Sequence, residues 1–312
     1  MYKFKVSYII VNWNAKDILK ECLDSIKVES AGIAHEIIII DNNSSDGSQE
    51  FIKNNYPDVI FIENKDNLGF SKANNIGIKK SCGEYLFLVN SDIIALKNSI
   101  RNMLSYMEKN IDVGMAGPRV FNRDMSKQTS CSKYPGLWNG LCGAFALNRV
   151  FPGSSVFSDW RMDYWEHDTE RTVDVLSGCF WVIRRAALDD VGLLDERFFI
   201  YGEDIDWSRR FNNSKWKVKF NPSAEIIHLG GVSSSRTPIR FYIEMQEANL
   251  KYWRKYHSRV KVLVYKLILF IHHLIRVSAR TLILLLKFKL NKFPNDFKVK
   301  RSLAVLKWLT TS

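Results

Sequence analysis

The chain has 312 residues, 46% of them hydrophobic, which is enough for one large domain with a sizeable core and an appendage. Its formal charge of +12 would suit a nucleic-acid-binding protein, but the charge is unevenly placed. From Lys251 onward there are 15 Lys and Arg and one acid, Asp296, whereas the preceding residues hold 30 basic and 32 acidic side chains. The near-neutral body argues against nucleic acid as a partner, and the basic end indicates an appended anchor.

Cysteine usage and the first residues bear on the compartment. The five cysteines are odd in number and include no C-x-x-C pair, which argues against a zinc site or a disulfide framework and suits a reducing compartment. The chain opens Met-Tyr-Lys-Phe-Lys, followed by an apolar run that is too short for the core of a signal peptide. We therefore expect synthesis and residence in the cytoplasm.

Strands and helices are predicted to alternate over the first hundred residues. Apolar runs predict strands at 6–11, 37–40, 59–62 and 85–89, and helical spacing predicts helices near 18–26 and 71–80. This alternation is typical of an α/β fold with a parallel, doubly wound sheet. No G-x-G-x-x-G or Walker sequence is present, so neither a dinucleotide site nor a P-loop is supported.

Polar residues follow three of these strands. The run 85–89 reads as a strand buried on both faces, and it ends in Asn90-Ser91-Asp92. Ligands of open α/β sheets bind at this edge, where Asp92 could grip a divalent cation that carries phosphates, or could merely cap the next helix. Asn12-Trp13-Asn14 offers amide donors, and Asp41 could accept a hydrogen bond from a base or ribose. The alternative for 41–48 is a helix-capping loop.

The second half of the chain carries a candidate base and a candidate ligand. A strand interrupted by Gly178 is predicted over 173–185, and Glu203, Asp204 and Asp206 then follow a run of aromatic residues. Acids beside aromatic residues have raised proton affinity and suit general-base work, although the helix dipole also favours acids at a helix start. His228 is either a structural histidine or a partner for Asp92 at a metal.

Between 118 and 172 the pattern loosens, and four aromatic residues there could form a sugar-stacking wall or simply pack: Trp138, Trp160, Tyr164 and Trp165.

Four motifs together resemble the family 2 glycosyltransferases of the GT-A fold. They read V-S-Y-I-I-V-N-W-N, I-I-I-I-D-N-N-S-S-D-G-S, N-L-G-F-S-K-A-N-N-I-G-I and Y-L-F-L-V-N-S-D. Within that family the chain is most similar to the bacterial rhamnosyltransferase-like branch, over roughly residues 6–232. The resemblance implies a Rossmann-like, mostly parallel sheet, here followed by amphipathic helices at the C-terminal end.

The resemblance also implies roles for named residues. The family's D-x-D appears as Asn90-Ser91-Asp92, so Asp92 is its one certain carboxylate and would bind Mg²⁺ or Mn²⁺ on the donor diphosphate. His228 would be a further metal ligand, Asp204 the base, and Glu203 the acceptor contact. The residues expected to hold the donor nucleotide are Asn12, Asn14, Asp41, Asn67, Gly69, Asn74, Asn90 and Ser91.

These observations predict an inverting, metal-dependent transferase that moves one sugar from a nucleotide-diphospho-sugar donor to a lipid-linked saccharide acceptor in cell-surface polysaccharide synthesis. The Q-x-x-R-W of processive members is absent, which indicates addition of a single sugar. The likeness favours dTDP-L-rhamnose as donor. A hexose, N-acetylhexosamine or galactofuranose donor, and a non-catalytic sugar-nucleotide-binding membrane protein, remain as alternatives.

The expected division is a catalytic domain at 1–235, with a nucleotide-sugar half at 1–117 and an acceptor half at 118–235, and a basic helical tail at 236–312. In the tail, Lys266, His273, Arg280 and Lys287 are spaced seven apart, and Arg276 shares their stripe. No run approaches the ~18 uncharged residues of a spanning helix.

A basic stripe on an apolar helix predicts a helix that lies in the membrane interface and is attracted to an anionic membrane surface. The alternative is a helix packed on the catalytic body. The expected location is peripheral, at the cytoplasmic face of the plasma membrane.

Overall fold

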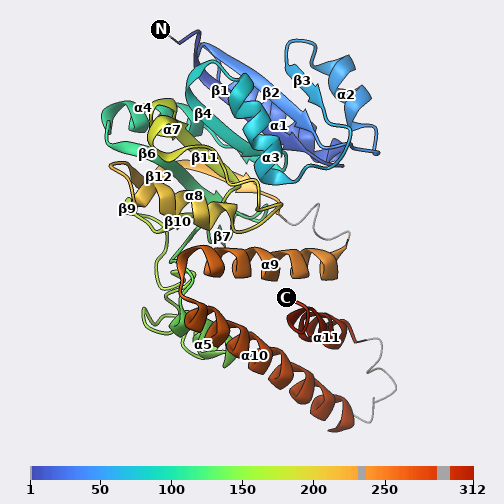
Figure 1. Ribbon diagram of the computed structural model, residues 1–312. Helices are drawn as coiled ribbons and strands as arrows, with labels where there is room; N and C mark the ends of the chain where they lie inside the picture. The colour runs from blue at the N-terminus through green and yellow to red at the C-terminus, as the bar shows by residue number, and fades with distance from the viewer. Residues whose placement is uncertain (1, 231–236, 287–295) are drawn as a thin grey trace. The chain divides into compact units, whose positions relative to one another are not determined.

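The computed structural model describes residues 2–230, 237–286 and 296–312, and divides the chain into two compact units (Figure 1). The first unit comprises 1–134 and 165–236, and the second comprises 135–164 and 237–312. The segment 135–164 was expected to belong to the acceptor half, but it groups with the C-terminal helices because α5 (Leu137–Ala144) packs against α10 (Arg259–Leu286).

The first unit is built on a ten-stranded sheet in the order β3-β2-β1-β4-β11-β6-β12-β5, with β7 beside β6 and β9 beside β12. The four strands of its N-terminal half run parallel to one another, as the alternation of strands and helices predicts. They are β1 (Phe4–Asn12), β2 (His35–Asp41), β3 (Ile60–Glu63) and β4 (Gly83–Asn90). The α/β, mostly parallel fold class is thereby confirmed.

The other strands of this unit are β5 (Ile93–Ala95), β6 (Val113–Phe121), β7 (Lys127–Gln128), β8 (Cys131–Ser132), β9 (Arg171–Thr172), β10 (Val175–Leu176), β11 (Phe180–Arg184) and β12 (Lys217–His228). Its helices are α1 (Lys16–Glu29), α2 (Ser48–Asn55), α3 (Phe70–Lys80), α4 (Ser99–Lys109), α7 (Arg185–Val191) and α8 (Glu203–Asn212). The strand β11 lies between β4 and β6 near the middle of the sheet and runs antiparallel to both.

The core lies on both faces of the central strands. Side chains of β1, β2 and β4 are almost fully buried, and the helical spacing predicted for 18–26 puts Leu19, Leu23 and Ile26 of α1 into this core. All five cysteines are free thiols, and four of them are buried.

The interrupted strand expected at 173–185 is two strands that belong to different sheets. β10 pairs with β8 in a two-stranded sheet, whereas β11 enters the main sheet. Gly178 lies at the break, where a Cβ atom would meet the Trp181 ring at 3.3 Å and the Phe70 ring at 3.6 Å. The glycine therefore permits close approach of two aromatic side chains.

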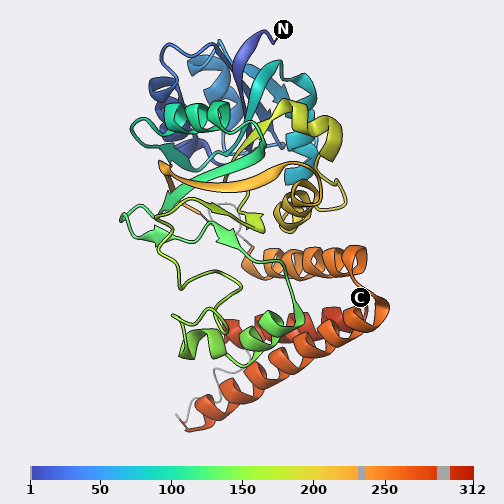
Figure 2. The same cartoon turned by 90° about the vertical axis from the view of Figure 1, so that its left-hand side faces the viewer.

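The second unit is helical and contains α5, α6 (Leu147–Val150), α9 (Pro238–Tyr256), α10 and α11 (Phe297–Leu309). α10 packs against α5, α9 and α11 (Figure 2). Among the described helices, α10 is long and apolar enough to cross a membrane by length and composition, and only 17% of its most apolar window is buried.

The basic stripe of α10 does not face outward as expected. His273 is fully buried, Lys266 donates to the Ser312 carbonyl, and Arg280 is paired with Asp296 at 2.6 Å. Lys287 lies outside the described residues. The exposed face is apolar instead and consists of Val260, Leu263, Val264, Leu267, Phe270, Ile271, Leu274, Ile275, Leu282, Ile283, Leu285 and Leu286. The stripe turns inward because Lys266 and Arg280 bind residues at the two ends of α11 and His273 is buried within the unit.

Candidate active site

Asp92 and His228 meet at the carboxyl edge of the parallel strands. Asp92 follows β4, and His228 ends β12, which pairs with β5 so that His228 lies opposite Ile93. The Leu229 amide donates to the Asp92 carbonyl at 2.9 Å. As a result His228 Nε2 lies 3.2 Å from Asp92 Oδ1, with the Asn90 side-chain nitrogen 3.5 Å away.

Gln128 fixes the orientation of the His228 ring. Its amide nitrogen donates to the Asn122 side chain at 2.7 Å and to the His228 carbonyl at 3.0 Å, which identifies Oε1 as the atom that faces the ring. That oxygen lies 2.6 Å from His228 Nδ1 and accepts a hydrogen bond from it. Nε2 is therefore left to face Asp92, which is the arrangement of a metal-binding histidine held by an outer partner.

The pair has the geometry of two neighbouring ligands of a divalent ion. Ligands about 2.1 Å from an octahedral ion and at right angles to each other lie roughly 3.0 Å apart, close to the 3.2 Å between Nε2 and Oδ1. Among the described residues no group of three His, Cys, Asp or Glu side chains could hold a metal. Mg²⁺ sites commonly combine one or two protein ligands with substrate phosphates and water. The two residues fit such a site.

The ends of β1 and β2 form a buried polar cluster. Asn12 Nδ2 donates to Asp41 Oδ1 at 2.7 Å, and the other Asp41 oxygen accepts from the Ser44 amide and from Gln49. Asp41 is 0% exposed, so its oxygens are occupied within the protein in this conformation. Asn14, at φ 52°, accepts from the Ser45 amide. The cluster organises the loop that was weighed as a nucleotide contact or a capping loop.

One atom of this cluster has no partner. The side-chain oxygen of Asn12 is buried and receives no hydrogen bond within the part of the chain that the structure describes. A buried acceptor without a donor costs free energy, so Asn12 is the member of the cluster that is best suited to meet a ligand.

The segment 67–75 joins the two halves of the sheet. Asn67 accepts from the Gly69 amide at 2.9 Å, and the Phe70 amide donates to the Phe199 carbonyl at 2.6 Å. Gly69 has φ +80°, and a Cβ atom there would lie 2.6 Å from the Phe199 ring. Asn74 is buried and donates to the Phe70 carbonyl of its own helix. These contacts lock the segment that leads to α8.

Asn75 completes this junction. Its side chain donates to the Leu194 carbonyl at 2.9 Å and accepts from the Leu194 amide at 3.1 Å, and it also donates to Glu196. A buried amide with three bonds to another loop is a structural clamp. Asn75 belongs to the motif N-L-G-F-S-K-A-N-N-I-G-I, whose resemblance implies contact with the nucleotide. Nothing local in the sequence distinguishes a structural clamp from such a contact.

Glu203 and Asp204 begin α8 in a low-dielectric setting. Burial raises the pKa of Asp204 to about 6. Burial, and next the charge of Asp204, raise the pKa of Glu203 above its usual value. Glu203 Oε2 is buried and accepts no hydrogen bond from any described residue. Asp206 instead pairs with Arg210 at 2.9 Å. A raised pKa near neutrality is what a general base needs.

The segment that leads to Glu203 is hydrogen-bonded to the start of α3, which follows the parallel strand β3. α3 begins directly after the carboxyl end of β3, and its first residue is bonded to Phe199, four residues before Glu203. Asp92 follows the carboxyl end of β4, where the Asn90 amide donates to the Cys179 carbonyl at 3.0 Å. Parallel strands present their carboxyl ends together, so this edge is the expected ligand site.

Residues 7–192, more than half of the chain, match the family model described as "Glycosyl transferase family 2". The chain belongs to glycosyl transferase family 2. It is therefore a glycosyltransferase, and the expectation drawn from its four motifs is confirmed.

Relatives of this family 2 glycosyltransferase include a rhamnosyltransferase and a hexosyltransferase. It is 29% identical over 237 residues to the N-acetylglucosaminyl-diphospho-decaprenol L-rhamnosyltransferase of Mycobacterium tuberculosis, covering 70% of this chain and 76% of that one. It is 24% identical to the low-salt glycan biosynthesis hexosyltransferase Agl10 of Haloferax volcanii, covering 78% and 73%.

A solved structure supports the fold. The mannosyltransferase PcManGT from Pyrobaculum calidifontis, in complex with GDP-Man and Mn²⁺, aligns with a TM-score of 0.56 and 14% identity over 100% of this chain and 87% of that one. At this identity the likeness shows the fold alone, which is GT-A.

The aromatic residues weighed as a sugar-stacking wall in this glycosyltransferase are divided between the units. Trp165 belongs to the first unit and packs edge-on against Phe220, with ring centroids 4.9 Å apart. Trp138, Trp160 and Tyr164 belong to the second unit. Trp165 thus has the packing role that was the alternative to a wall.

Proposed function

We propose that this glycosyltransferase adds one sugar, with inversion, from a nucleotide-diphospho-sugar donor to a lipid-linked saccharide. The observation that carries the proposal is the pairing of Asp92 with His228 at the carboxyl edge of the parallel strands. The first unit would be the catalytic part, and the second would associate with the membrane. The fold and the family support this assignment of the first unit.

Asp92 and His228 would hold Mg²⁺ or Mn²⁺, with the remaining positions left to the donor diphosphate and water. The bound ion would act as a Lewis acid that neutralises charge on the departing diphosphate. Gln128 keeps Nε2 of His228 directed at the site. Asn12, with its free buried oxygen, would meet the nucleotide at the neighbouring strand end, together with Asn14, Asn90 and Ser91.

Asp204 would take the proton from the acceptor hydroxyl as that hydroxyl attacks the anomeric carbon from the face opposite the diphosphate. With a pKa of about 6, it is ionised at neutral pH and remains basic enough to accept a proton. Glu203, whose buried oxygen accepts no bond from a described residue, would receive a hydrogen bond from the acceptor sugar.

L-Rhamnose from dTDP-L-rhamnose is the donor that the mycobacterial relative's name favours. The same relative's name includes a diphospho-decaprenol acceptor, which supports a lipid-linked acceptor here. The outward apolar face of α10 supports a membrane location, because a helix whose polar residues face inward and whose apolar residues face outward suits a lipid environment. We propose that catalysis takes place at the cytoplasmic face of that membrane.

The test is transfer by the purified full-length protein. A panel of nucleotide sugars is offered with a synthetic polyprenyl-diphosphate-linked saccharide, with Mg²⁺, Mn²⁺ or EDTA. We expect transfer of one sugar with inverted anomeric configuration, highest with dTDP-L-rhamnose and lost in EDTA. Metal-dependent donor binding without transfer or hydrolysis would instead indicate the non-catalytic alternative, and full activity in EDTA would contradict the metal assignment.

A further inference from the structure

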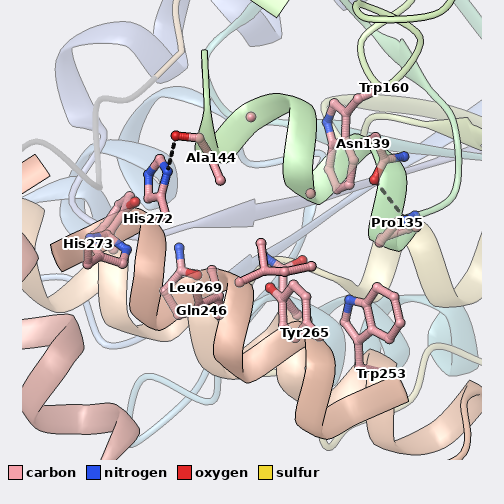
Figure 3. Close-up of a pocket in the computed structure, with 16 residues that line it drawn as sticks. Pro135, Asn139, Ala144, Trp160, Gln246, Trp253, Tyr265, Leu269, His272 and His273 are labelled. Carbon is pink, nitrogen blue, oxygen red and sulfur yellow. Dashed lines mark hydrogen bonds between the residues drawn. The ribbon is translucent and has the colours of Figure 1, made fainter. Parts of the chain in front are cut away.

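The second unit contains a pocket of about 260 Å³ between α5, α9 and α10 (Figure 3). Trp160 and Asn139 line one side of it, and side chains of α9 and α10 line the opposite side. The rings of Trp253 and Tyr265 are stacked, with centroids 4.7 Å apart and planes at 13°. Aromatic and aliphatic side chains dominate the lining, so the pocket suits an apolar group.

Two glycines keep the pocket open. Gly140 and Gly143 lie within α5 and line the pocket. A Cβ atom on Gly143 would meet nothing within 4 Å, and one on Gly140 would touch only Ile268 at 4.0 Å. Glycine weakens a helix relative to alanine, and packing does not require it at either position. What the two glycines provide is space.

Buried polar atoms of the pocket have no hydrogen-bond partner among the residues that the structure describes. His273 is 0% exposed, and neither ring nitrogen makes a hydrogen bond with any described residue. Trp253 is 1% exposed, and its indole nitrogen is likewise unpaired. Unpaired buried polar groups are costly, and their occurrence together in one pocket points to a ligand that supplies the missing partners.

Unneutralised arginines lie beside this pocket. The Arg301 guanidinium lies 4.5 Å from the ring centroid of Tyr242, which lines the pocket. Arg276 is three residues after His273 on α10, and therefore on the same helical face. Within the described ranges neither arginine has a carboxylate at ion-pair distance, whereas Arg280 on the next turn is neutralised by Asp296.

Arg149 is a third cation close to the pocket, because its charge acts on His272, which lines the pocket. Burial lowers the pKa of His272, and the charges of Arg276, Arg301 and Arg149 lower it further. Three arginines thus lie near the histidine end of an apolar pocket, and no described acid forms an ion pair with Arg276 or Arg301. A neutral lipid would leave these arginines unpaired, and a free anion would leave the apolar walls unfilled. Guanidinium groups bind phosphates with paired, charge-assisted hydrogen bonds.

We propose that this pocket binds a single-chain lipid phosphate or diphosphate, with the hydrocarbon between α5 and α10 and the phosphate on Arg276 and Arg301. The volume suits one chain rather than the two of a glycerophospholipid. The outward face of α10 is apolar, so such a ligand would come from the bilayer. The inference rests on the proposed lipid-linked acceptor, whose lipid diphosphate would be held here.

The experiment titrates the full-length protein, without donor, with farnesyl diphosphate, and follows tryptophan fluorescence. We expect farnesol and inorganic diphosphate to bind at least ~10-fold more weakly than farnesyl diphosphate, because each satisfies only half of the site. Arg276→Gln and Arg301→Gln should each weaken binding by about 10-fold or more, the usual effect of losing a charged hydrogen bond. Gly143→Leu should weaken it similarly by filling the pocket, and Gly143→Ala should do so to a smaller extent.

Lys261→Gln is the matched control, because it removes one charge from an exposed position of the same helix. Equal weakening by Lys261→Gln and Arg276→Gln, or undiminished binding to both Gly143 variants, would overturn the proposal. Inorganic diphosphate binding as tightly as farnesyl diphosphate would indicate an anion site without a lipid site. Farnesyl diphosphate binding with no sugar transfer to any acceptor would leave this site standing while the proposed function fails.

Discussion

Glu203 and Asp204 are the residues at which stability and activity conflict. Two adjacent acids at the buried start of α8 raise each other's cost of ionisation, and Glu203 lacks a hydrogen bond within the described structure for one oxygen. The helix dipole alone would favour acids at this position. A buried carboxylate oxygen without a donor, as in Glu203, is the kind of local strain that proteins keep where chemistry needs it.

Asp204→Asn should abolish turnover while leaving donor binding intact. Removal of a positioned base typically costs ~10²- to 10⁴-fold in rate. The measurement is kcat for transfer alongside the dissociation constant of the donor. Near-normal kcat in this variant would exclude Asp204 as the base, and Asp206→Asn, which alters an acid paired with Arg210, is the control for helix stability.

The rate of transfer should fall as pH decreases through about 6, where Asp204 becomes protonated. Protonation removes the lone pair that accepts the acceptor's proton, so activity belongs to the ionised form above that pH. The pH profile of kcat/KM tests this. A profile that stays flat from pH 5 to 8 would contradict the assignment.

Glu203→Gln should stabilise the protein at neutral pH while lowering activity. Because the folded-state pKa of Glu203 is raised, the folded chain resists ionisation that the unfolded chain undergoes above its usual pKa of 4.5. Wild-type stability therefore decreases as pH rises from 4.5 through the folded pKa. The amide removes this loss, so Tm should rise by a few degrees at pH 7.5 and change little at pH 4. An unchanged Tm at both pH values would show that folding does not raise the pKa of Glu203.

At the scale of elements, one junction transmits order between the two halves of the sheet. The start of α3 is bonded to the segment before α8 through Phe70 and Asn75. Gly69 allows this approach because a Cβ atom would collide with Phe199. The segment 67–75 therefore also holds in place the segment that leads to Glu203 and Asp204, the proposed catalytic acids.

Gly69→Ala should destabilise the first unit more than Gly32→Ala. Both glycines have a left-handed φ near +80°, which costs a side chain about 1–2 kcal/mol. A Cβ atom at Gly32 has only the flexible end of Arg101 nearby, at 3.7 Å, whereas at Gly69 it meets Phe199, which adds roughly 1–3 kcal/mol. Denaturant unfolding of both variants measures the difference. Equal destabilisation would mean that the α3 junction yields without cost.

Gln128→Ala should weaken metal binding, so that more Mn²⁺ is needed for half-maximal activity, without unfolding the sheet. Gln128 lies on the short strand β7 and holds His228 through Nδ1. Loss of such an outer partner typically costs 10- to 100-fold in metal affinity. The Mn²⁺ concentration for half-maximal activity, compared with that of the conservative variant Gln128→Glu, checks this. Unchanged Mn²⁺ dependence in Gln128→Ala would remove Gln128 from the site.

At the scale of the whole molecule, the second unit stands out by the apolar side chains that it exposes. Its longest helix buries His273, partly buries Arg276 and Arg280, and exposes leucine, isoleucine, valine and phenylalanine side chains. The segment 135–164 adds exposed apolar side chains to the same unit, namely Trp138, Phe145, Val150, Phe151 and Val156. Exposed apolar surface of this extent marks a membrane or partner contact.

Leu267→Glu combined with Phe270→Glu should abolish flotation with liposomes, because each charge would have to enter an apolar environment. Both side chains are exposed, so the change does not disturb a core. Val28→Glu, at a 71% exposed valine of the first unit, is the matched control. Retained flotation of the double variant would contradict membrane contact by α10. Carbonate extraction of the wild type then separates a spanning helix from a peripheral one.

Local patterns determined much of this protein. The parallel strands, the helix over 18–26 and the four motifs follow from apolar periodicity and from polar residues at strand ends, and these depend on neighbours in sequence. The family assignment followed from the same residues. The meeting of Asp92 and His228, 136 positions apart, was suggested by chemistry alone, and it needs the pairing of β12 with β5 to occur.

Only the tertiary structure decided the rest. Whether Asp41 meets a ligand or a neighbour depends on burial, which no local pattern reports. Gln128 gave no signal because its role exists only through contact with a residue 100 positions away. The basic stripe of α10 has the same spacing whether it faces lipid or protein, and the packing of α9 and α11 settled its direction. Side-chain direction is fixed by long-range contacts, and a periodic pattern cannot contain them.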